Sequence, residues 1–205
     1  MSEPTVIARG VGVELGGVPV LRGADLTAAP GEVVAVLGAN GAGKTTLLRC
    51  LAGLQRSEGT VLVLGRPPAD TPDFWRNVAW AGDEPAWYPG LTAGEHLELM
   101  RAMHGPGRLE AGRALELFGL AALADRTPPS LSTGQRQRLS LAAALLRPSR
   151  VLLLDEPERG LDADFRDRLA GLLDAYAADG GTVVMVTHDA GLARSARPLV
   201  LEAAA

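Results

Sequence analysis

The sequence is poor in cysteine and has no long apolar run. Its single cysteine, Cys50, excludes an internal disulfide and is typical of a protein in a reducing compartment. No apolar stretch approaches the ~18 residues that a membrane-spanning helix needs. Residues 1–10 also lack the charged-then-apolar layout of a secretory signal. The sequence therefore predicts one cytoplasmic domain, 1–205, that meets a membrane only through a partner protein.

Lysine is almost absent as well. Of the 20 lysines and arginines, one is a lysine, Lys44, and the others are all arginines. A chain that uses arginine everywhere else and keeps one lysine here needs a compact ammonium group at this position. The net charge of −4 argues against non-specific binding to nucleic acid, so we expect no nucleic-acid partner.

The lone lysine lies in a glycine-rich segment, residues 38–46, which we call the phosphate loop. An apolar run before it, 33–37, predicts a buried strand, and the apolar residues after it predict a helix. This order fits the pattern G-x-x-x-x-G-K-[ST], in which backbone amides at a helix N-terminus bind phosphate. Lys44 would reach the β- and γ-phosphates of a nucleotide, and the Thr45 hydroxyl would bind Mg²⁺. The predicted nucleotide-binding residues are Gly38, Asn40, Gly41, Ala42, Gly43, Lys44, Thr45 and Thr46.

The rest of the chain alternates between strand and helix patterns, which predicts an α/β fold with helices on both faces of a parallel sheet. Two strands joined by Gly16-Gly17 open the chain, and a Pro-rich loop is expected at 66–73. Thr92 with Glu95 forms a capping-box pattern at the start of a mainly helical insert. The expected strands are 6–15, 18–26, 33–37, 60–64, 78–80, 151–154 and 182–186, and further helices are expected at 109–118, after Gln135 and at 163–176.

Two adjacent acids follow the apolar strand at 151–154. Asp155, at the tip of a buried strand, suits a carboxylate that holds Mg²⁺ together with Thr45. Glu156 is placed to polarise an attacking water as a general base. The alternative is that these acids only cap the following helix. The phosphate loop upstream favours the catalytic interpretation.

The order of motifs resembles the ATP-binding subunit of ABC transporters over essentially the whole chain. After the phosphate loop come Leu-Ser-Thr-Gly-Gln at 131–135 (the signature segment), Leu-Leu-Leu-Asp-Glu-Pro at 152–157, Gly-Leu-Asp at 160–162 and a strand that leads to His188. The resemblance implies a P-loop ATPase core with an N-terminal antiparallel β subdomain and an inserted helical subdomain at about 84–147. It also implies that two such subunits, a homodimer or a pair of paralogues, sandwich ATP between one phosphate loop and the partner's signature segment.

The resemblance assigns further residues to the site. It implies that Ser132, Gly134 and Gln135 bind the γ-phosphate held by the other subunit, that Asp162 lies in the loop coupling the two sites, and that His188 contacts the γ-phosphate and the attacking water. With Lys44 and Glu156, His188 completes the expected catalytic set. A plain helix N-cap is the alternative for Ser132, and a structural histidine is the alternative for His188.

Two departures from the family pattern concern nucleotide and metal binding. Leu15 stands where the family has an aromatic residue that stacks on adenine, so we expect base binding through weaker aliphatic contact. Asp83 stands where the family has a glutamine that reaches Mg²⁺. Either Asp83 replaces that ligand, which we favour, or its shorter side chain does not reach the metal.

The resemblance predicts an ATP- and Mg²⁺-dependent motor subunit that powers a separate permease at the inner face of the cell membrane. The compact chain resembles the subunits of small exporters, so we expect export. The alternatives are an ABC-type ATPase without a membrane partner and a weakly hydrolysing regulatory subunit. The transported substrate and the choice between homodimer and heterodimer do not follow from the sequence.

Overall fold

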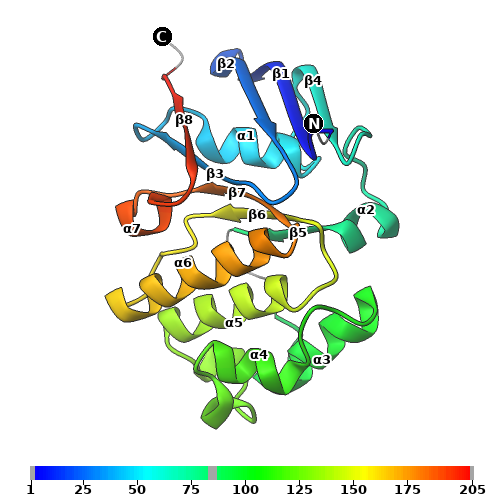
Figure 1. The fold of residues 1–205 in the computed structure, drawn as a ribbon, viewed down its shortest axis with the longest axis vertical. Coiled ribbons are helices and arrows are strands. Elements are labelled where there is room, and N and C mark those ends of the chain that lie inside the picture. The colour runs from blue at the N-terminus through cyan, green and yellow to red at the C-terminus, as the bar shows by residue number, and fades with distance from the viewer. Residues whose placement is uncertain (1–2, 83–86, 204–205) are drawn as a thin grey trace.

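Two sheets form the body of the protein (Figure 1), whose computed structural model describes residues 3–82 and 87–203. The first sheet is antiparallel and has the strand order β2-β1-β4. The second is parallel and has the order β5-β6-β7-β3-β8. The strands are β1 Val6–Leu15, β2 Val18–Ala28, β3 Val33–Gly38, β4 Glu58–Val63, β5 Val78–Ala81, β6 Val151–Asp155, β7 Thr182–Val186 and β8 Arg197–Leu201.

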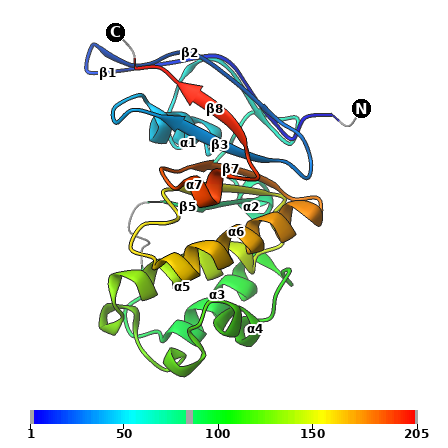
Figure 2. The ribbon, with the colours of Figure 1, turned by 60° about the vertical axis from the view of Figure 1, so that its left-hand side comes forward.

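The inner strands of the parallel sheet, β6, β7 and β3, are buried on both faces, as their near-continuous apolar residues predict. In β3, Val34 and Val36 face the antiparallel sheet and helix α1 (Lys44–Leu51), which lies between the two sheets. Val33 and Ala35 face the opposite core, which contains α5 (Thr133–Leu145) and α6 (Ala163–Ala178). Figure 2 shows the same layers from a second direction. The predicted α/β class and the antiparallel β subdomain are confirmed.

A helical region lies beyond α5, at the end of the molecule away from the antiparallel sheet (Figure 2). It contains α3 (Ala93–His104), α4 (Ala111–Leu117) and two short 3₁₀ turns, Ala121–Leu123 and Pro128–Ser130. The capping box predicted at Thr92 and Glu95 is present at the start of α3. In the described part of the chain, no helix is both long and apolar enough to span a membrane.

Some elements of the structure differ from the sequence-based expectations. The Pro-rich loop expected at 66–73 is present as far as Thr71, and a short helix that was not predicted, α2 (Pro72–Asn77), follows it, because Thr71 caps the helix and proline is well tolerated in the first helical turn. Strand β4 begins two residues earlier than expected. Helix α7 (Ala190–Ala193) and strand β8 were not predicted, because Pro198 weakens a strand pattern except at a sheet edge, where β8 lies.

Candidate nucleotide site

Three neighbouring strands of the parallel sheet bring the predicted site residues to one edge. The phosphate loop follows β3, Asp155 ends β6, and His188 comes two residues after β7. Strand β7 lies between β3 and β6, and all three run parallel, so their carboxyl ends meet. Ligands of open α/β sheets bind at this edge of the sheet.

The phosphate loop closes around its own lysine. Lys44 begins α1, and its ammonium group donates to the carbonyl oxygens of Gly38 at 2.8 Å and Ala39 at 2.9 Å, with only 7% of the residue exposed. Gly43, before it, has φ 84°, and a Cβ there would lie 2.6 Å from the carbonyl oxygen of Val20 on β2. The loop is therefore fixed by packing, and the third hydrogen of the ammonium group remains for a phosphate oxygen.

Two of the three predicted metal ligands lie in contact. The Thr45 hydroxyl donates to Asp155 Oδ1 at 3.1 Å, which places two oxygen ligands side by side at the end of the phosphate loop. Among the described residues, no three His, Cys, Asp or Glu side chains gather into a metal site. The Thr45–Asp155 pair fits Mg²⁺, which takes one or two protein ligands and completes its shell with water and phosphate oxygens.

Glu156 has an unusual backbone conformation. Its φ is +47°, a value that non-glycine residues rarely adopt and that is typical of functional sites. Its backbone N–H donates to the carbonyl oxygen of Val186, at the end of β7, at 2.9 Å. Its carboxylate lies 3.8 Å from Nε2 of His188, and both side chains are about half exposed, at 45% and 47%. The Glu156 carboxylate and the His188 imidazole therefore lie side by side, and solvent reaches both.

The signature segment forms the start of α5. The Ser132 hydroxyl accepts the backbone N–H of Gln135 at 3.2 Å, and the Gln135 side chain accepts the N–H of Ser132 at 2.9 Å. A Cβ on Gly134 would lie 2.4 Å from the carbonyl oxygen of Gly160, so this segment packs directly against the loop after β6. The plain N-cap considered for Ser132 is thus present, and an additional role in nucleotide binding stays a prediction.

Asp162 ties that same loop to α5 and α6. Its Oδ1 caps α6 by accepting the backbone N–H of Phe165 at 2.8 Å, and its Oδ2 pairs with Arg138 of α5. The Phe165 amide, followed by the Arg138 charge, holds the pKa of the Asp162 carboxyl below its usual value. Asp162 is therefore a charged, anchored residue at the contact between the signature segment and the loop that follows Glu156.

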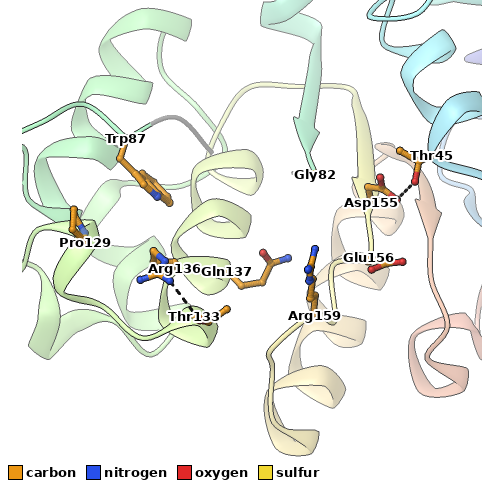
Figure 3. Close-up of a pocket in the computed structure, with 10 residues that line it drawn as sticks. All are labelled: Thr45, Gly82, Trp87, Pro129, Thr133, Arg136, Gln137, Asp155, Glu156 and Arg159. Carbon is orange, nitrogen blue, oxygen red and sulfur yellow. Dashed lines mark hydrogen bonds between the residues drawn. The ribbon is translucent and has the colours of Figure 1, made fainter. Parts of the chain in front are cut away.

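A pocket of about 550 Å³ joins the two groups of residues (Figure 3). In that view Asp155 and Glu156 lie on one side, Trp87 and Arg136 on the other, and Arg159 between them. The ring of Trp87 meets the buried His96 edge to face, with their ring centres 5.3 Å apart. The lining residues are Thr45, Gly82, Trp87, Pro129, Thr133, Arg136, Gln137, Asp155, Glu156 and Arg159.

Two predicted residues stand apart from this cluster. Leu15 ends β1 beside Val18, and 48% of it is exposed, so the structure leaves it accessible but does not place it beside a nucleotide. Asp83 lies outside the described residues. The sequence reasoning missed Arg136 and Arg159 as pocket residues and Glu158 as a partner of His188. A signal for the last two was present in the charged pair between Pro157 and Gly160.

Comparisons with known proteins agree with this arrangement. The family described as ABC transporter matches residues 21–159, more than half of the chain. The chain is 45% identical over 174 residues to the cytochrome c biogenesis ATP-binding export protein CcmA of Bordetella bronchiseptica, covering 83% of this chain and 78% of that protein. It is 42% identical over 185 residues to the Fe(3+) ions import ATP-binding protein FbpC of Streptomyces avermitilis, covering 87% of this chain and 54% of that protein.

A solved structure extends the likeness to three dimensions. It shows a dimeric ATP-binding cassette in a post-hydrolysis state bound to ADP and phosphate. The two folds agree with a TM-score of 0.84 at 28% sequence identity, over 96% of this chain and 94% of that one. The cassette is thus preserved across nearly all of the described fold.

Proposed function

The chain belongs to the ABC transporter family, and we propose that it is the subunit whose ATP hydrolysis drives export through a separate membrane-spanning permease. The observation that carries this function is the meeting of Lys44, Glu156 and His188 at the ends of three adjacent parallel strands. The relative from Bordetella bronchiseptica is named as an export protein and is matched over 78% of its length, whereas FbpC, named as an import protein, is matched over 54%, which supports export.

Each residue at this edge has a role that its contacts support. Lys44 and the loop amides bind the β- and γ-phosphates, because they form an anion-binding ring at a helix N-terminus. Glu156 accepts the proton of the attacking water, and His188, 3.8 Å away, orients the water and the γ-phosphate. Thr45 and Asp155 would hold Mg²⁺, which neutralises the charge that develops on the phosphates.

The second half of the site comes from another subunit. Ser132, Gly134 and Gln135 belong to the start of α5, whose Thr133 and Arg136 line the same pocket as Thr45 and Asp155. The related cassette is dimeric, which supports a pair of such chains or a pair with a paralogue. The permease docks on this assembly at the inner face of the cell membrane, so the chain itself stays cytoplasmic.

Removal of the general base tests both hydrolysis and pairing. In Glu156→Gln the shape of the side chain is kept and proton acceptance is lost, so ATP hydrolysis should fall by about a hundredfold or more. Bound ATP then persists, and light scattering should show a dimer with ATP and Mg²⁺. Glu116→Gln is the matched control, because Glu116 is exposed on α4 and its carboxylate pairs with Arg113 on the same helix.

The outcomes separate the alternatives. A wild-type chain that binds ATP without turnover would be a regulatory subunit and not a motor. A Glu156→Gln chain that stays monomeric with saturating ATP and Mg²⁺ would contradict homodimerisation and leave pairing with a paralogue. Uptake of substrate into inverted membrane vesicles on addition of ATP would support export, and ATP-driven loss of preloaded substrate from them would support import.

A further inference from the structure

One carboxylate beside the catalytic pair has no role in the cluster described above. Oε1 of Glu158 accepts the backbone N–H of His188 at 2.8 Å, across 30 residues of sequence. Oε2 of Glu158 is shielded from solvent and has no hydrogen-bond partner within the described chain. Because an unpaired buried oxygen is costly, this placement needs an explanation. The hydrogen bond from the His188 N–H to Oε1 offers a reason for the carboxylate to lie here.

The loop that carries Glu158 is fixed at several points. The Glu156 N–H donates to β7, the Pro157 carbonyl accepts from Gln137 Nε2 at 3.2 Å, and the Glu158 carbonyl accepts the Leu161 N–H at 3.0 Å. Asp162, at the end of the loop, pairs with Arg138 of α5. Glu158 therefore projects from a rigid support that also carries Glu156.

His188, in contrast, lies on a short connection between β7 and α7. The next residue, Asp189, caps α7 and forms an ion pair with Arg166 of α6 at 2.8 Å. The Asp189 N–H also donates to the Thr187 hydroxyl at 3.0 Å, which closes a local turn around His188. None of these bonds uses the backbone N–H of His188. The hydrogen bond to Glu158 joins this backbone to the loop of Glu156, and the His188 imidazole lies 3.8 Å from the Glu156 carboxylate.

We propose that Glu158 is a positioning residue that sets the distance between His188 and the general base Glu156. It acts through the His188 backbone, and its side chain makes no hydrogen bond to the phosphate loop within the described residues. This inference rests on the proposed ATPase function. It implies that loss of the Glu158 acceptor lowers kcat while the KM for ATP stays unchanged.

Three variants test this role. Glu158→Ala removes the acceptor, so kcat should fall about tenfold, with KM changed by less than about twofold, and the His188 amide should exchange its hydrogen at least about tenfold faster. Glu158→Gln keeps an oxygen at the same place, so kcat should stay within about threefold of wild type, with slow exchange retained. Glu116→Ala removes an exposed glutamate elsewhere and should change neither quantity.

The two measurements are independent. Amide exchange, followed by NMR on the nucleotide-free protein, reports the anchoring of His188 even if the chain lacks turnover, so failure of the proposed function is recognised separately. Slow exchange with normal kcat in Glu158→Ala would overturn the inference. So would a Glu158→Gln variant as impaired as the alanine variant, or a change confined to KM. If Glu158→Ala does not fold, Glu158→Met removes the acceptor at similar volume and serves in its place.

Discussion

The two sides of the pocket are built in different ways. On the side of the parallel sheet, Asp155 and Glu156 stand at the end of β6, which the hydrogen bonds of the sheet hold in place, and Thr45 lies in the first turn of α1 within the phosphate loop. On the side of the helical region, Thr133 and Arg136 stand at the start of α5, whose capping box already pairs the polar groups of Ser132 and Gln135. One side is a preassembled phosphate site, and the other is an exposed helix start.

This difference supports the proposal that two chains together complete a catalytic site. The sheet side holds the buried Lys44, the Thr45–Asp155 pair and Glu156, which in the proposed function accept a nucleotide within one subunit. The helix side offers backbone amides and a hydroxyl at its surface, and these suit a phosphate brought by another molecule. Changes on the sheet side should therefore abolish chemistry, and changes on the helix side should weaken assembly.

The largest effect is expected from Lys44→Arg. The planar guanidinium is too large for the ring formed by the Gly38 and Ala39 carbonyls, so it should displace the loop and lower ATP turnover by about a hundredfold or more. Steady-state phosphate release measures this. Arg22→Lys, an exchange of the same two residue types at an exposed position, should leave turnover unchanged. Near-normal turnover in Lys44→Arg would show that the single lysine is accidental.

Gly134→Ala should displace the start of α5 on the helix side of the pocket and leave the residues of the sheet side in place. The new Cβ would meet the Gly160 carbonyl oxygen at 2.4 Å, so the start of α5 has to move away from the loop after β6. We expect turnover to fall about tenfold and stability to fall by about 1–3 kcal/mol, with ATP binding by the monomer preserved. Calorimetry with ATP and urea unfolding measure the two quantities.

Gly171→Ala is the control for that change. Gly171 lies inside α6, and a Cβ there would meet no atom within 4 Å. Alanine at this position should raise stability by about 0.5–1 kcal/mol, because it lowers the entropy of the unfolded chain and favours the helix. If both glycine variants behave alike, the contact between the signature segment and Gly160 has no specific importance.

The motifs predicted the sheet side well, because its information is local in sequence. The spacing of its glycines predicts the phosphate loop, and the apolar run before Asp155 predicts a buried strand. The contacts that complete the site join distant segments, such as Gly134 with Gly160 and Glu158 with His188. The periodicity of apolar residues along the sequence does not indicate which distant residues come into contact. Strand β8 was missed for a related reason, because its place beside β3 depends on tertiary pairing and not on its own weak pattern.

A smaller effect is expected at Leu15, which tests where the nucleotide base lies on the sheet side. If adenine rests on the exposed end of β1, Leu15→Tyr adds a stacking surface and should tighten ATP binding about fivefold. GTP binding should tighten similarly, because stacking discriminates poorly between purines. Leu54→Tyr places the same ring on another exposed leucine and should have no effect. Unchanged calorimetric affinity in Leu15→Tyr would place the base elsewhere.

The smallest effect is expected where the helical region joins the body. Arg147, at the end of α5, donates to the carbonyl of Val78 at 3.3 Å and lies 3.2 Å from Nδ1 of His104 on α3. Burial, together with the charges of Arg147 and Arg76, lowers the pKa of His104 from 6.5 to about 4. Neutral His104 accepts a hydrogen bond from Arg147, whereas the protonated form would repel it.

The sign of the pH dependence follows from this lowered pKa. Between pH 6.5 and 4 the unfolded chain binds a proton at His104 that the folded protein excludes, so stability is complete above pH 6.5 and falls as the pH approaches 4. Because His104 is partly exposed, solvent screening limits this loss to about 1 kcal/mol or less. His104→Asn removes the titrating group, so its urea midpoint should fall less than that of wild type between pH 7 and pH 4.5. Parallel curves for the two proteins would contradict a neutral His104 at the junction between the helical region and the body.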